Sequence, residues 1–226
     1  MKKPALSVSL MCMDLLQVGR QLSVLDPAAD WYHIDLMDWH YVRNLTLSPD
    51  FMKAVRRASS VPMDAHLMVD AVDLDLVRLC VESGAKCVSL HPETAEPRIY
   101  RILQYLKQQK VQFGVVLNPA TPLQTAQAYL EHVDKVTYMA VDPGFAGQAF
   151  IPDVLRKIEE GCRLRAGRGL HFRIEVDGGC NRSTFRPILQ AGCDQIIVGG
   201  SALFSRDADL QKAVAQLQHE LAEAAQ

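Results

Sequence analysis

The chain has 226 residues, of which 49% are apolar and 22% are charged, and its formal net charge is −2. The apolar residues suffice for a sizeable core and the length suits one large domain, so we expect a single domain over residues 1–226. Because no long run of Lys and Arg is present, the sequence argues against nucleic acid and membranes as partners.

Targeting signals and cysteine usage point to the cytoplasm. The first residues lack the apolar run of a secretory signal, and no segment is apolar over the length that crosses a bilayer. The six cysteines are scattered without a C-x-x-C pair, and several lie inside apolar patterns. This placement favours buried thiols in a reducing compartment, although spacing alone leaves disulfides open.

Short apolar runs rich in β-branched residues recur along the chain, and each is followed by an amphipathic stretch. The runs predict strands at residues 6–11, 31–37, 62–69, 87–91, 112–117, 135–141, 173–178 and 195–199. Helical periodicity between and after them is clearest at residues 50–58, 72–83, 97–110, 153–165, 183–191 and 209–225. Gly84 and Gly192 follow two of these stretches, where glycine supplies the left-handed residue that ends a helix.

Eight strands that alternate with eight helices predict parallel βαβ units, and closure of eight such units gives a (β/α)8 TIM barrel. An open, doubly wound sheet is the alternative architecture. Eight near-equal repeats without a linker or a composition shift favour the closed barrel.

Imidazole and carboxylate side chains stand near the ends of three predicted strands. Because strand side chains alternate, His33 and Asp35 share one face of the second strand. Asp64 and His66 share one face of the third, and Asp177 lies near the end of the seventh. Barrel enzymes assemble their sites at the C-terminal ends of the strands, so these groups can converge there.

Two imidazoles and two carboxylates are donors that a divalent cation needs, and the carboxylates offset its charge. A single strand histidine is more often a core residue than a ligand. A carboxylate that points into an apolar barrel without a partner, however, costs several kcal/mol. The pattern therefore favours a metal site, although periodicity alone does not establish convergence.

Glycine-rich turns follow three late strands, at residues 142–148, 177–179 and 199–201. Glycine lets backbone N–H groups approach an anion closely, and barrel phosphate sites commonly use the loops after strands seven and eight. The simpler interpretation is that these glycines only form tight turns. Three such loops in neighbouring positions favour a phosphate site.

These motifs, taken together, resemble the ribulose-phosphate 3-epimerase family over nearly the full chain. The matching segments are SLM at 9–11, HIDLMD at 33–38, NLT at 44–46, HLMV at 66–69, LNP at 117–119, VDPGFAGQ at 141–148, FIP at 150–152 and EVDGG at 175–179. Finer features look like the branch that acts on D-allulose 6-phosphate: SLMCMDLL at 9–16, NLTLSP at 44–49, HPET at 91–94 and Ala146 in the glycine loop.

The resemblance implies a TIM barrel of the ribulose-phosphate-binding type with a divalent metal held by His33, Asp35, His66 and Asp177. It also implies that Asp35 and Asp177 are the catalytic acid–base pair and that Ser9 and His66 contact the sugar. The residues implied at the phosphate end are Gly144, Phe145, Ala146, Gly147, Gly178, Gly179, Gly200 and Ser201.

The sequence departs from the family in the loop after the second strand. Trp39 stands where the family usually has Gly, and Arg43 stands where it usually has Pro. A tryptophan adds a large ring to a barrel loop near the substrate, and Arg43 lacks the fixed φ of proline. The expected metal ligands are unaffected, and the two substitutions bear on which sugar fits.

The chemistry that we expect is proton transfer at C3 of a ketose phosphate. One aspartate removes the C3 proton and the other returns a proton on the opposite face, through an enediolate that the cation stabilises. Zinc is favoured, iron(II), manganese, cobalt and magnesium are open, and no nucleotide cofactor is needed because no net oxidation occurs. Met37, Met68 and Met139 are expected either to line the site or to pack in the core.

Three functional hypotheses follow. The first is epimerisation of D-allulose 6-phosphate to D-fructose 6-phosphate, and the second is epimerisation of D-ribulose 5-phosphate. The third, of another class, is a non-catalytic barrel that binds phosphosugars. The resemblance also implies a homo-oligomer, either a dimer or a hexamer.

Overall fold

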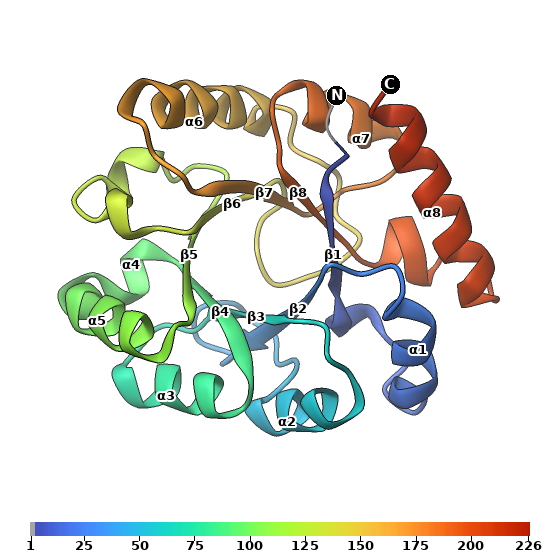
Figure 1. The fold of residues 1–226 in the computed structure, drawn as a ribbon, viewed down its shortest axis with the longest axis horizontal. Coiled ribbons are helices and arrows are strands. Elements are labelled where there is room, and N and C mark those ends of the chain that lie inside the picture. Colours follow the sequence, from blue (N-terminus) through green and yellow to red (C-terminus); the bar gives the residue numbers. More distant parts are fainter. Residues whose placement is uncertain (1–2) are drawn as a thin grey trace.

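Strands and helices alternate in the computed structural model, which describes residues 3–226 (Figure 1). The strands are β1 (Ala5–Ser9), β2 (Trp31–Met37), β3 (Met63–Met68), β4 (Ala85–Leu90), β5 (Gln112–Leu117), β6 (Lys135–Met139), β7 (Arg173–Asp177) and β8 (Gln195–Val198). The α-helices are α1 (Val18–Leu25), α2 (Pro49–Ala58), α3 (Leu74–Glu82), α4 (Pro92–Ala95), α5 (Ile99–Gln109), α6 (Val154–Arg168), α7 (Arg182–Gln190) and α8 (Leu210–Ala224).

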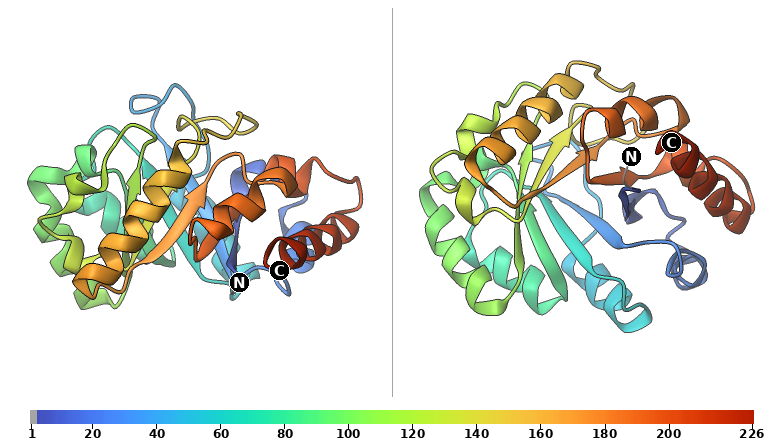
Figure 2. Two further views of the ribbon diagram at one scale, coloured as in Figure 1. Left: turned by 90° about the horizontal axis from the view of Figure 1, so that it is seen from above. Right: turned by 45° about the horizontal axis from the view of Figure 1, so that its top comes forward.

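The strands pair in parallel and in sequence order, and β8 closes on β1. Seen down the barrel, the strands form the centre and the helices surround them (Figure 1). The predicted (β/α)8 barrel is therefore confirmed, and the open doubly wound sheet is excluded. Seen from the side, the loop after β2 and the loop after β6 rise from the same end of the barrel (Figure 2).

One part of the expected pattern is wrong. In the described residues, the connection from β5 to β6 contains two short 3₁₀-helices, η3 (Leu123–Ala126) and η4 (Leu130–His132), in place of an α-helix. The chain between β5 and β6 therefore departs from the repeated strand–helix pattern.

Several helices begin at a polar capping residue that follows a strand. Ser48 Oγ accepts the backbone N–H of Phe51 at the start of α2, and Asp73 does the same for Leu76 at the start of α3. Asn181 begins α7 in a reciprocal capping box. These caps satisfy N–H groups that have no partner inside the helix, and so they fix where each loop at the barrel mouth ends.

The outward faces of the strands pack against the helices. Tyr32 and Ile34 of β2 are fully buried, as are Leu22 of α1 and Met52 of α2, and they belong to one continuous apolar core. Because β2 is covered on this face, the alternate residues of the strand must point into the barrel. The core thus fixes the register that turns His33 inward.

The barrel interior contains a buried group of charges below its C-terminal end. Lys135 of β6 contacts the carboxylates of Asp64 on β3 and Glu175 on β7, the latter at 2.6 Å. Ser89 Oγ donates to Asp64 at 2.7 Å, and Gln195 Nε2 donates to Glu175 at 2.5 Å. Burial alone would lower the pKa of Lys135, but the two carboxylates raise that pKa above its usual range. The lysine is therefore the counter-charge of this layer.

Lys135→Met should reduce the free energy of unfolding by about 3–5 kcal/mol, because Asp64 and Glu175 would remain buried without their cation. Lys53→Met is the matched control, since Lys53 pairs with the exposed Asp50 and should matter by less than about 1 kcal/mol. Urea unfolding followed by circular dichroism measures both. Equal stabilities of the two variants would contradict the role given to Lys135.

Candidate functional site

The four side chains expected to bind a metal lie together at the C-terminal end of the barrel strands. Each offers one nitrogen or oxygen atom, and these atoms lie within 4.8 Å of one another. Strand register explains part of this convergence, because Asp35 of β2 lies opposite His66 of β3. The members of this cluster, called the His/Asp cluster below, are His33, Asp35, His66 and Asp177.

The contacts inside the His/Asp cluster are short. His33 Nε2 lies 3.1 Å from His66 Nδ1 and 3.3 Å from Asp35 Oδ1. His66 Nδ1 lies 3.2 Å from the same carboxylate oxygen, and Asp177 Oδ2 lies 3.8 Å from His33 Nε2. The other oxygen of Asp35 accepts a hydrogen bond from Ser9 Oγ at 2.8 Å. Asp35 is therefore fixed by groups on three strands.

The protein environment displaces the pKa values of the two aspartates in opposite directions. Burial raises the pKa of Asp177, and the nearby charge of Asp35 adds to this effect. Burial alone would also raise the pKa of Asp35, but His33 and His66 hold it well below its usual range. In turn, burial alone would lower the pKa of His33, and Asp35 raises it well above normal.

The His/Asp cluster fits a divalent cation. Two buried imidazole nitrogens at 3.1 Å and two carboxylates place several lone pairs in mutual contact, and a 2+ ion would satisfy them together. Mixed nitrogen and oxygen donors suit zinc and the first-row transition metals. A second group of possible ligands, His33, Asp64 and Glu175, fits a cation poorly because Lys135 already contacts both of its carboxylates.

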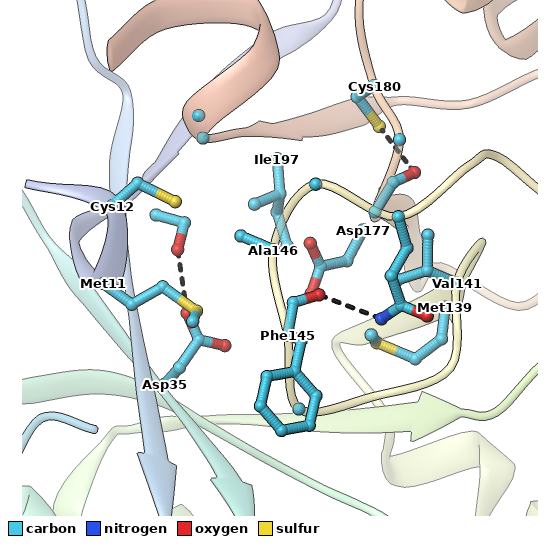
Figure 3. Close-up of a pocket in the computed structure, with 18 of the residues that line it drawn as sticks. Met11, Cys12, Asp35, Met139, Val141, Phe145, Ala146, Asp177, Cys180 and Ile197 are labelled. Carbon is cyan, nitrogen blue, oxygen red and sulfur yellow. Dashed lines mark hydrogen bonds between the residues drawn. The ribbon is translucent and has the colours of Figure 1, made fainter. Parts of the chain in front are cut away.

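A cavity opens above the cluster at the barrel mouth, and Asp35 and Asp177 face it from opposite sides (Figure 3). Most residues expected to bind substrate line this cavity: Ser9, Gly144, Phe145, Ala146, Gly147, Gly178, Gly179, Gly200 and Ser201. His33 and His66 are fully buried and do not line it. His66, which was also expected to contact the sugar, thus lies outside the described lining of this cavity.

The three glycine-rich loops meet around this one cavity. Gly179 has a φ of +64°, and a Cβ atom there would lie 2.9 Å from the backbone of Phe150, so a side chain cannot be accommodated. Lysine and arginine are absent from the described residues of the lining. An anion bound here would thus depend on backbone N–H groups and on the Ser201 hydroxyl.

Apolar sulfur-containing side chains complete the cavity wall. Met37, Met68 and Met139 all line it, together with Met11. Cys12 also lies in the wall, and burial raises the pKa of its thiol, so the group stays neutral. These side chains limit the number of ionisable groups that compete with Asp35 and Asp177 for protons.

The loop after β2 differs from the sequence-based expectation. Trp39 has a φ of +68°, a conformation that favours glycine, and its side chain is half exposed outside the cavity lining. Its ring is therefore not in contact with the cavity. Arg43 Nη1 donates to the Trp39 carbonyl at 3.1 Å, and Asn44 Nδ2 donates to the Gly144 carbonyl at 2.7 Å. The Asn44 side chain thus connects the loop after β2 to the glycine-rich loop at residues 142–148.

Sequence reasoning missed the groups that surround the cluster. His33 Nδ1 lies 3.2 Å from Asp64 Oδ2, and Asp64 in turn is held by Lys135. His66 Nε2 lies 3.0 Å from Nε2 of His91, which follows β4. The sequence does show a lysine, Lys135, inside an apolar strand pattern and a histidine, His91, at the end of a strand. Neither feature indicates which side chain the residue contacts.

Three comparisons with known proteins show what the chain is similar to. A family model described as the ribulose-phosphate 3 epimerase family matches residues 5–204. Ribulose-phosphate 3-epimerase of Bacillus subtilis is 37% identical over 211 residues, which cover 92% of this chain and 95% of that protein. The Escherichia coli (strain K12) protein of the same name is 38% identical over 224 residues, or 98% of both chains. A crystal structure of KGPDC from Streptococcus mutans superposes with a TM-score of 0.76 over 99% of both chains, and its 14% identity supports the fold alone.

We expect the protein to bind one zinc ion per chain, because the His/Asp cluster offers one compact set of donors. Zinc at 100 times its dissociation constant should stabilise the fold by about 2.7 kcal/mol. Calorimetric titration and thermal unfolding measure the two effects. His66→Ala should abolish both, and the exposed His132 provides the control His132→Ala. Unchanged zinc binding by His66→Ala would remove His66 from the ligand set.

Proposed function

The chain belongs to the ribulose-phosphate 3-epimerase family, and we propose that it interconverts D-allulose 6-phosphate and D-fructose 6-phosphate. The coarser activity follows from the family: the protein is an isomerase that acts on small carbohydrate phosphates. The identity of the ketose, the residues that perform the reaction and the metal are the parts that we propose.

The observation that carries the proposed mechanism is the placement of Asp35 and Asp177 on opposite sides of one cavity (Figure 3). A 3-epimerase must remove the proton at C3 from one face of the substrate and supply a proton to the other face. Two carboxylates that face each other across the substrate can perform these two steps without a rearrangement of the protein.

We assign the two carboxylates complementary roles in one direction of the reaction. Asp35, which accepts a hydrogen bond from Ser9 and contacts two imidazoles, serves as the base. Asp177, on the other side of the cavity, delivers the proton on the opposite face. After turnover the protonation states are exchanged, and the reverse reaction uses the same two residues.

The His/Asp cluster would hold the cation beneath the substrate. A divalent cation, for which we favour zinc, supplies positive charge that stabilises the enediolate formed when C3 loses its proton. His33 and His66, which are both fully buried, would each bind the cation through one ring nitrogen. Their rings would also exclude water from the floor of the site. Nucleotide cofactors have no role in this scheme, because the reaction involves no net oxidation.

The phosphate end of the substrate would lie against the glycine-rich loops. The backbone at Gly178, Gly179 and Gly200 borders the cavity, and Ser201 adds a hydroxyl donor. Because the lining offers neutral donors, this end would recognise phosphate by hydrogen-bond geometry. The methionines of the wall would face the carbon chain.

The preference for the hexulose rests on residues of the allulose-type motifs that border the cavity. Cys12 and Ala146 both line it, and Phe145 and Gly147 flank Ala146 in the loop after β6 (Figure 3). The second candidate substrate is D-ribulose 5-phosphate, and the names of the curated relatives favour it. The two ketoses share the C2–C3 unit that the aspartates act on and differ in chain length.

Assembly and location complete the proposal. We expect a homo-oligomer, either a dimer or a hexamer, and the exposed side chains of Leu16 and Tyr100 would support contacts between copies. We also expect a cytoplasmic location, in keeping with six cysteines that the structure describes as free thiols. Within the described residues, no helix has the length and apolarity needed to span a membrane.

Asp177→Asn should reduce kcat by about 10²–10⁴-fold, because the amide cannot exchange a proton at C3. The assay is deuterium exchange from solvent into C3 of D-fructose 6-phosphate with zinc present. The exposed Asp75 provides the control Asp75→Asn, and circular dichroism checks that both variants fold. Near-normal exchange by Asp177→Asn would remove this residue from the mechanism. Absence of exchange by the wild type would instead favour a non-catalytic barrel.

The wild-type protein should have a higher kcat/KM for D-allulose 6-phosphate than for D-ribulose 5-phosphate. Ala146→Gly should reduce this preference on the order of tenfold, because it removes one methyl group from the cavity wall. Ala149→Gly is the matched control, since Ala149 lies in the same loop outside the cavity lining. A wild-type preference for the pentulose would reject our choice of substrate.

A further inference from the structure

Each imidazole of the His/Asp cluster directs one nitrogen inward and the other nitrogen away. His66 directs Nδ1 inward, 3.1 Å from His33 Nε2 and 3.2 Å from Asp35 Oδ1. Its other nitrogen, Nε2, lies 3.0 Å from Nε2 of His91. Both the His66 ring and the His91 ring are fully buried, with centroids 5.1 Å apart. The contact with His91 is thus shielded from water and concerns the nitrogen that cannot bind the cation.

This contact restricts the tautomer of His66. A neutral imidazole binds a cation through its unprotonated nitrogen, so His66 must carry its proton on Nε2 if Nδ1 is to be a ligand. A proton on Nδ1 would instead point at Asp35 and block the ligand position. The Nε2–H group of His66 needs an acceptor in this buried place, and His91 Nε2 is the atom at hydrogen-bond distance.

His91 is itself held in the orientation that this role requires. The ring of Tyr41 lies against it, with centroids 4.7 Å apart. His91 Nδ1, the nitrogen that must carry the proton when Nε2 accepts, has no hydrogen-bond partner in the described part of the chain, and Glu93 Oε1 lies 4.0 Å from it. Tyr41 Oη donates to Glu93 at 2.8 Å, and Asn118 Nδ2 donates to Tyr41 Oη at 2.7 Å. The negative charge of Glu93 on this side of the ring favours the tautomer that carries its proton on Nδ1 and accepts at Nε2.

Packing alone does not account for these contacts. The main chain of His91 begins α4, where its carbonyl accepts from Thr94 N and Thr94 Oγ1, and any residue could provide that carbonyl. An apolar ring at this position would fill the same space. Only a side chain with an acceptor at the place of Nε2 can pair the outer nitrogen of His66.

We propose that His91 is a positioning residue that accepts the Nε2–H of His66 and thereby reserves Nδ1 of His66 for the metal ion. The proposal rests on the metal-dependent function proposed above. Through Tyr41 and Glu93, it also connects the metal ligand to the loop after β2, in which Trp39 and Arg43 depart from the family. His91 acts through His66 and need not touch the substrate.

The test compares zinc dissociation constants of the wild type, His91→Phe and His91→Gln by competition with a chromogenic chelator. Phenylalanine keeps the ring but removes the acceptor, so zinc binding should weaken by about 10–100-fold. Glutamine can place its carbonyl oxygen near the position of Nε2, so His91→Gln should recover most of the affinity. His132→Phe repeats the substitution at an exposed site and should bind zinc like the wild type. Thermal unfolding of each protein without metal checks that the variants are folded.

The outcomes separate this proposal from the proposed function. If the wild type fails to bind zinc, the proposed metal-dependent function is wrong, and the role of His91 fails with it. If the wild type binds zinc and His91→Phe binds equally well, only the positioning role is overturned. If folded His91→Gln is as weak as His91→Phe, the acceptor is not what His91 contributes, and the proposal is likewise overturned.

Discussion

The structure depends on the compensation of charge along the inside of the barrel. Asp64 and Glu175 each precede a cluster residue by two positions on their strands, so they point inward one layer deeper than His66 and Asp177. Lys135 supplies the cation for this lower layer. The upper layer has two carboxylates and two imidazoles without a lysine or arginine among their contacts in residues 3–226. A divalent ion would be a suitable counter-charge for that layer. The lower layer thus has its counter-charge from the protein itself, whereas the upper layer has donor atoms suited to a metal ion.

The sequence predicts well which strand side chains point into the barrel, but it predicts poorly which of them contact one another. Period-two alternation was enough to place His33 with Asp35 and Asp64 with His66, and the parallel register brings these strands into contact. Strand alternation carries no information about which distant strand lies opposite across the barrel interior. For this reason the contact of Lys135 with Asp64, 71 residues away, could not be read from the sequence. The fold can be predicted from a repeated local pattern, whereas the contacts between buried charges form only when the strands close into a barrel.

Two features depart from the sequence-based expectation. The connection from β5 to β6 forms two short 3₁₀-helices where the repeat predicted an α-helix. Trp39 was identified from the sequence as an unusual replacement of glycine, but its position could be assigned only with coordinates. Its φ of +68° lies in the region that glycine adopts most readily, and its side chain is half exposed and outside the cavity lining.

The two imidazoles of the His/Asp cluster use different nitrogens, and this difference explains why their supports lie in different places. His33 presents Nε2 to the cluster, so Nδ1, the nitrogen nearer its own backbone, faces Asp64 in the layer below. His66 presents Nδ1 instead, so its distal Nε2 reaches sideways to the residue that follows the neighbouring strand β4. A carboxylate on the barrel axis suits the first arrangement, because Lys135 can neutralise it there. A second carboxylate beside His66 would add negative charge next to Asp35, whereas a neutral imidazole accepts the same hydrogen bond without that repulsion. The choice of histidine at position 91 is therefore consistent with the charge balance that the barrel already maintains.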